Sequence, residues 1–69
     1  MTQKELLYVE DAIEHENNLI KILSDTKARL QDENLISLIE NHINTHTTIK
    51  EELTSKLEVK ANEWSIINK

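Results

Sequence analysis

The chain contains no cysteine, glycine or proline, and its only aromatic residues are Tyr8 and Trp64. Without cysteine there can be no disulfide and no thiolate metal site. Strand-rich folds need turn residues at many corners, and glycine and proline are prominent among them. A fold with one or two corners has no such need. These absences favour an all-α protein.

The chain also lacks long apolar runs, nucleophile–base pairs and any segregated positive charge. Its short apolar runs predict no membrane span and no signal-peptide core, so we expect a cytoplasmic protein without a membrane partner. The net charge is −5, and lysines alternate with glutamates over residues 50–60, which argues against a nucleic-acid partner. With no glycine-rich loop to hold phosphate, we predict that the protein is not an enzyme.

What remains is a helical pattern that starts at Thr2 and Glu5, which fit a capping box. Apolar residues then recur three and four positions apart, a row typical of an amphipathic helix over residues 3–30. Ala12 and Leu19 widen this row. Its members are Leu6, Val9, Ile13, Glu16, Ile20, Leu23, Lys27 and Leu30.

The phase of this pattern changes at residues 31–34, which predicts a turn followed by a second helix over residues 35–64. Asp32 is a candidate N-cap, and Asn34 could supply a left-handed residue. One unbroken helix in a coiled coil is the alternative. The second row comprises Leu35, Leu38 or Ile39, His42, His46, Ile49, Leu53, Leu57, Ala61 and Trp64.

A chain of 69 residues forms one domain, here a helical hairpin over residues 1–69, and a domain this small is marginally stable alone. One hairpin leaves part of each apolar row in contact with water. We therefore predict an all-α antiparallel two-helix hairpin that dimerises into a four-helix bundle, with a homodimer as the expected partner state.

Three polar residues interrupt the apolar rows near one level of the hairpin: Glu16, His42 and His46. Glu16 is expected near Ile49, with His46 one turn away. The i, i+4 histidines can chelate a divalent metal. Packed neutral histidines, or a Glu16–His46 pair that sets the register, are the alternatives that we favour, so we predict no cofactor.

Other polar and aromatic residues have ordinary structural explanations. We expect Lys27 to reach solvent at the end of the bundle. We expect Tyr8 and Trp64 to fill the core at the open end, with a partner-contact patch as the alternative.

The chain resembles the small spore coat proteins of the coat protein F type, which belong to the ferritin-like superfamily. The resemblance spans residues 4–57 and rests on residues 5–12 (ELLYVEDA), 15–16 (HE) and 30–35 (LQDENL). Ferritin-like di-iron proteins combine a Glu with a Glu-x-x-His pair. Here Glu16 matches the first position, but His46 and Ile49 fall at the pair, and Ile49 cannot bind metal.

The resemblance implies a non-enzymatic structural or assembly role in sporulating cells, including assembly into the spore coat. Two alternatives stay open. The protein could be a small intracellular regulator that binds a protein partner through its helices. It could also be a ferritin-like metal-binding relic that uses Glu16, His42 and His46.

Overall fold

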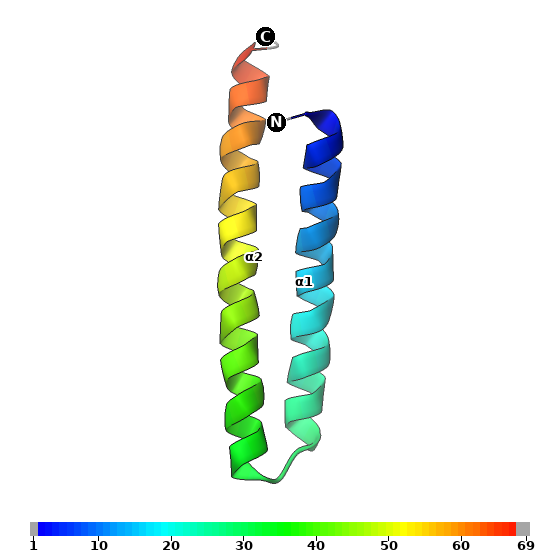
Figure 1. The fold of residues 1–69 in the computed structure, drawn as a ribbon, viewed down its shortest axis with the longest axis vertical. Coiled ribbons are helices and arrows are strands. Elements are labelled where there is room, and N and C mark those ends of the chain that lie inside the picture. The colour runs from blue at the N-terminus through cyan, green and yellow to red at the C-terminus, as the bar shows by residue number, and fades with distance from the viewer. Residues whose placement is uncertain (1, 68–69) are drawn as a thin grey trace.

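The protein is an antiparallel hairpin of two long helices (Figure 1). The computed structural model describes the backbone of residues 2–67 and the side chains of residues 2–60. Helix α1 spans Gln3–Arg29 and helix α2 spans Glu33–Ile67, so α2 extends past the start of α1. No strand occurs within residues 2–67. The predicted all-α hairpin is confirmed.

The start of α1 is closed by the predicted capping box. The Thr2 hydroxyl accepts a hydrogen bond from the Glu5 amide at 3.1 Å, and the Glu5 carboxylate accepts one from the Thr2 amide at 2.9 Å. The hydrogen bond from the Thr2 amide lowers the pKa of the exposed Glu5 carboxyl below its ordinary value of 4.5. Two backbone donors that a helix start leaves unpaired are thereby satisfied.

The turn is shorter than predicted and needs no left-handed residue. It consists of Leu30–Asp32, and Leu30 is extended (φ −90°, ψ 147°), with its amide donating to the Lys27 carbonyl at 3.2 Å. Asp32 is the N-cap of α2, as predicted, because its Oδ1 accepts from the Asn34 and Leu35 amides at 2.8 and 3.1 Å. The suggestion that Asn34 adopts the left-handed conformation is wrong, since it lies in the first turn of α2.

In α1, the residues that face α2 are those predicted from the sequence. Every member of the predicted row is half-buried, including the polar Glu16 and Lys27, and so are Ala12 and Leu19. We call the half-buried rows through which the two helices contact each other the seam. In α1 the seam comprises Leu6, Val9, Ile13, Glu16, Ile20, Leu23, Lys27 and Leu30.

In α2, the seam differs from the predicted row. Leu35, His42 and Ile49 were expected to face α1 but are exposed, and of the alternatives Leu38 and Ile39 only Ile39 is half-buried. The prediction is confirmed for His46, Leu53 and Leu57, which are half-buried. Lys50 hid the seam in the sequence. A lysine is ordinarily expected at an exposed position, but here it is half-buried. Ala61 and Trp64 fall outside the side chains that the structure describes. The seam of α2 comprises Ile36, Ile39, Ile43, His46, Lys50, Leu53 and Leu57.

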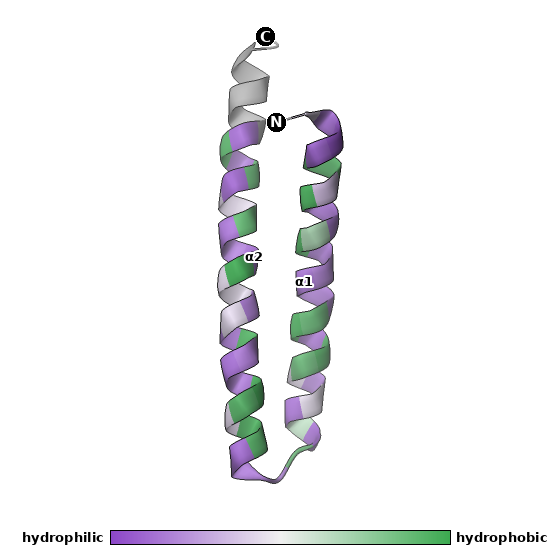
Figure 2. Cartoon of the chain, viewed as in Figure 1, coloured by the Kyte–Doolittle hydropathy of each residue, from purple (hydrophilic) through white to green (hydrophobic). Residues whose placement is uncertain are grey.

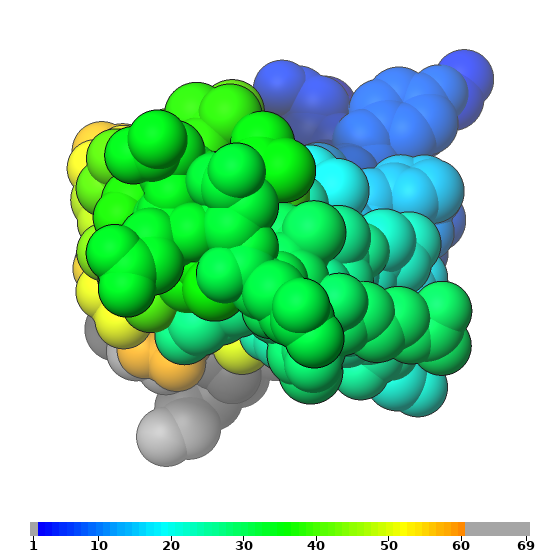
Figure 3. All heavy atoms as spheres, turned by 90° about the horizontal axis from the view of Figure 1, so that it is seen from below, coloured from blue at the N-terminus to red at the C-terminus, as the bar shows by residue number. Residues whose placement is uncertain are grey.

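The hairpin has no sealed core. Among residues 2–60, no side chain is fully buried. Seen from the turn end, the molecule is two helices wide and one helix deep (Figure 3), with extents of 54 × 15 × 13 Å. Apolar and polar residues alternate along both helices, and apolar residues are prominent where α2 leaves the turn (Figure 2). Each seam residue is therefore covered on one side only.

Candidate functional site

A polar pair, Glu16 of α1 and His46 of α2, lies within the otherwise mostly apolar seam. The Nδ1 atom of His46 is 2.6 Å from Oε2 of Glu16, and the side chains are 24% and 19% exposed. The contact makes Glu16 level with His46 rather than with Ile49, three residues earlier in α2 than predicted. A half-buried charge-assisted hydrogen bond of this kind holds two helices in one register.

The third predicted site residue, His42, does not join this pair within one hairpin. His42 is exposed, one turn before His46 on α2. Within the part of the chain that the structure describes, no three or more His, Cys, Asp or Glu side chains cluster in a way that could hold a metal. Within a single described hairpin, the candidate set Glu16, His42 and His46 is therefore reduced to two contacting residues.

Lys27 makes an ion pair that the sequence did not reveal. Its Nζ lies 3.1 Å from Oε1 of Glu40, and the two side chains are 42% and 49% exposed. The expected solvent exposure of Lys27 is thus only part of its environment. Because the pair is exposed, we expect its contribution to stability to be small.

A second row of residues runs beside the seam on both helices. Each member immediately precedes a seam residue, as Ile22 precedes Leu23 and Ile49 precedes Lys50, except Val59, which continues the same spacing past Leu57. A two-fold axis perpendicular to the plane of the two helices relates an antiparallel pair, so the same offset puts both rows on one face of the hairpin. We call this the apolar face, after its apolar members: Tyr8, Ala12, Leu19, Ile22, Leu35, Leu38, Ile49 and Val59.

Exposure and surface shape support this assignment. Seven large apolar side chains are exposed within residues 2–60, and all except Leu7 belong to the apolar face. Their exposed fractions run from 36% for Ile49 to 61% for Ile22. A groove of about 290 Å³ opens on the face, lined by Val9, Ile49, Glu52, Leu53 and Lys56. The prediction that Tyr8 fills the hairpin core is wrong, since its ring is 60% exposed.

The opposite face of the hairpin is polar. It carries the residues that immediately follow each seam residue, and we call it the polar face. On α2 it has no apolar member over residues 37–58. Its members on the two helices include Glu10, Asn17, Ser24, Ser37, Glu40, Asn44, Thr47, Glu51, Thr54 and Glu58. On α1 it also carries Leu7 and Ala28, so the contrast between the two faces is clearest on α2.

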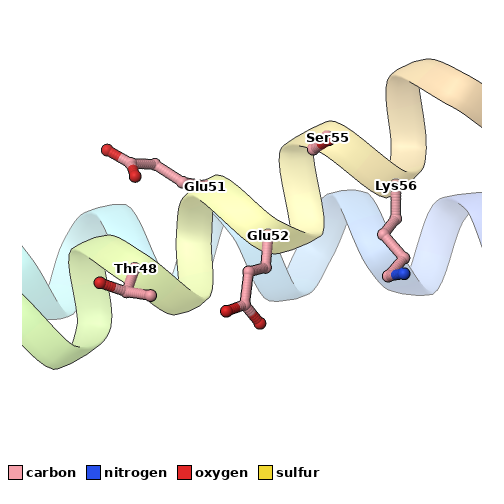
Figure 4. A pocket seen from close by; sticks show the side chains of 5 residues that line it. All are labelled: Thr48, Glu51, Glu52, Ser55 and Lys56. Atoms are coloured by element: carbon pink, nitrogen blue, oxygen red, sulfur yellow. The ribbon is translucent and has the colours of Figure 1, made fainter.

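A surface depression on α2 is not an enclosed site. It has a volume of about 420 Å³ and is lined by α2 alone, through Thr48, Glu51, Glu52, Ser55 and Lys56. In Figure 4 the Glu51 and Glu52 carboxylates point to different sides of the helix, and Lys56 extends away from Glu51. All five residues are exposed. Side chains that diverge from one helix cannot converge on a substrate.

Comparison with known proteins adds no relative. No family model matches the chain, and no curated protein or solved structure matches it significantly. In the described part of the chain, neither helix is both long and apolar enough to cross a bilayer. The apolar face and the Glu16–His46 pair are thus the features on which a function can be based.

Proposed function

We propose that this protein is a non-enzymatic structural or assembly protein that acts through helix–helix self-association, with a homodimeric four-helix bundle as its basic unit. One observation carries the proposal. No described side chain is fully buried in the hairpin, while six large apolar side chains are gathered on a single face. Large exposed apolar side chains gathered on one face, with polar residues among them, are typical of an interaction surface.

A second copy of the same hairpin fits the apolar face in length and area. The paired part of α1 has 27 residues, or about 40 Å of helix at 1.5 Å per residue. With a width of 15 Å, such a face would bury about 600 Å² per copy and about 1,200 Å² in total. That total reaches the range of specific, stable protein interfaces.

The sequence pattern of α2 also favours a bundle over a lone hairpin. In a four-helix bundle each helix contacts two neighbouring helices, and the side that faces the bundle interior lies between these two contacts. For α2 that side lies between the seam and the apolar face. Residues spaced four and three apart point in that direction: Leu35, Ile39, His42, His46, Ile49 and Leu53. This is the row that the sequence predicted. Ile39, His46 and Leu53 also belong to the hairpin seam, whereas Leu35, His42 and Ile49 lie outside it and would face the interior that a second copy creates.

The resemblance to small spore coat proteins of the coat protein F type supports the same role. Coat proteins work by assembling, and the ferritin-like superfamily is built from helical bundles. We extend the proposal to assembly in sporulating cells on this resemblance alone. Detecting the protein in purified spores and not in growing cells would support the extension, and the reverse distribution would contradict it.

Matched variants test the association itself. Ile22→Asp/Leu38→Asp adds two charges to the apolar face, and Ser24→Asp/Ser37→Asp adds two to the polar face, all at exposed positions. Sedimentation equilibrium should give twice the chain mass for the wild type and the polar-face variant, and the single chain mass for the apolar-face variant. A well-folded monomeric wild type would contradict self-association and would favour a different protein as the occupant of the face.

A metal-binding role is a second candidate, favoured by the 2.6 Å Glu16–His46 contact with His42 one turn away. Zinc would then raise the melting temperature by mass action, and His42→Ala/His46→Ala would abolish the rise. If the protein is purely structural, zinc should leave the melting temperature unchanged. A saturable zinc effect that the double variant removes would favour the metal-binding role.

A further inference from the structure

The Glu16–His46 pair occupies a special position along the hairpin. Glu16 lies thirteen residues after Gln3 and thirteen before Arg29, at the centre of α1. Both residues belong to the part of the seam next to the apolar face. Their neighbours one turn away on that face are Ala12, Leu19, His42 and Ile49. A partner that covered the apolar face would therefore also cover the pair.

The symmetry of the dimer determines which residues of the second copy lie against the Glu16–His46 pair. Two copies packed face to face are related by a two-fold axis that lies in the interface and runs either along the hairpins or across them. An axis along the hairpins brings every level of one copy against the same level of the other. An axis across their middle does so for the central level. The two Glu16–His46 pairs meet in both arrangements.

We propose that the two Glu16–His46 pairs of a dimer form one polar layer at the centre of the bundle, and that this layer fixes the alignment of the two hairpins. The inference rests on the proposed self-association. It gives Glu16 and His46, two polar residues in a mostly apolar interface, a specific structural role. A single buried polar layer is known to select one register among several apolar alternatives.

The hydrogen-bonding capacity of the pair allows such a layer. His46 uses Nδ1 toward Glu16, and within residues 2–60 its Nε2 atom makes no hydrogen bond. When the imidazole is protonated, both nitrogens carry hydrogen, so Nε2 can donate to Glu16 of the second copy. With the axis along the hairpins, α1 of one copy lies over α2 of the other, so two imidazolium and two carboxylate groups alternate and the layer is neutral.

Spin labels can measure the alignment, because the chain has no native cysteine. A label at Ser24→Cys is exposed on the polar face, away from the interface. Electron–electron double resonance should give one narrow distance in the wild-type background. Glu16→Leu/His46→Leu should remain dimeric, because apolar replacement of a buried pair is often neutral or stabilising, but its distance distribution should become broad or multiple.

The control exchanges apolar residues one heptad away in the seam, Leu23→Ile/Ile39→Leu, and should keep the single distance. An unchanged single distance in Glu16→Leu/His46→Leu would overturn the polar layer. No intermolecular distance in the wild-type background would instead contradict self-association. If Glu16→Leu/His46→Leu failed to fold by circular dichroism, the same measurement on Glu16→Gln would replace it, with broadening still expected.

A chelator separates the hydrogen-bonded layer from a metal site made of the same side chains. Adding EDTA should leave the dimer and its single spin-label distance unchanged, both in the wild-type background and in His42→Ala. Dissociation caused by chelator would overturn the hydrogen-bonded layer and assign the four side chains to a cation.

Discussion

The two helices differ in how clearly their sequences mark the residues that meet. In α1, the apolar row read from the sequence is the seam. In α2, the row read from the sequence mixes residues of two rows that lie side by side, the seam and the apolar face. The inner row, which includes Ile36 and Ile43, faces α1, and the outer row, which includes Leu35 and Ile49, lies on the apolar face. A helix with two apolar rows has residues for two partners, and its periodicity alone cannot say which partner takes which row.

The largest effect is expected when one charge is introduced into either of the two rows of α2. Ile43→Asp should abolish both helicity and association, because an unpaired charge in the seam costs about 2–4 kcal/mol. Ile49→Asp should abolish association while retaining more of the helicity. Circular dichroism and sedimentation equilibrium measure the two effects. Glu51→Ala, at an exposed position, is the control and should change stability by about 0.5 kcal/mol or less. Equal loss of helicity at positions 43 and 49 would mean that the inner row is not the seam.

A gain of stability should follow when the inner row is made continuous. Lys50 is the half-buried charged member of that row. Lys50→Leu should raise the free energy of unfolding by about 1 kcal/mol, because it replaces a partly buried stem with a wholly apolar side chain. Lys21→Leu is the control at an exposed position on the polar face. Urea denaturation of both variants decides the point, and a stabilisation confined to Lys21→Leu would place Lys50 outside the seam.

The two helices also begin with different caps. Asp32→Ala removes the acceptor for two amides of α2 and should cost about 1 kcal/mol. Thr2→Ala removes one acceptor at a chain end, so we expect a smaller loss. Thermal melts at one protein concentration allow the comparison. A larger effect at Thr2 would indicate that the start of α1 matters more to the hairpin than the turn does.

The smallest expected effect is a pH dependence at the start of α1. The pKa of Glu5 is lowered in the folded chain, so its contribution is complete above the ordinary value of 4.5 and is lost as the pH falls below it. The Leu6 amide, bonded to the Thr2 carbonyl at 3.0 Å, should then exchange faster with solvent. Glu5→Gln should show no such acid-dependent increase. An increase that persisted in Glu5→Gln would assign the effect to another group.

Much of the fold could be predicted because it depends on local chemistry. The Thr2–Glu5 capping box and the Asp32 cap are short-range patterns with one physical interpretation. The bounds of α2 were less accurate, since it begins two residues earlier and ends three residues later than predicted. The end of α1 could not be located by a glycine, and the extended Leu30 leaves no recognisable mark in the sequence.

The site was predicted in part. Glu16 and His46 stood out as polar residues on apolar rows, and their suggested register-setting pair is present. The shift in register was not foreseeable, because a turn shortened to Leu30–Asp32 moves every facing residue of α2. The Lys27–Glu40 ion pair was missed for the same reason. The sequence does contain a signal for the apolar face, because apolar residues recur one position before seam residues.

The three-residue turn has a consequence for how the molecule forms. The contacts nearest the turn join residues close in sequence, so the chain entropy lost in making them is small. Two helices joined in this way can pair on a timescale of microseconds to milliseconds. Meeting a second chain is bimolecular and slows with dilution. Assembly would therefore proceed from a rapidly formed hairpin, and the rate at which the finished unit appears would be set by how much of the chain a cell produces.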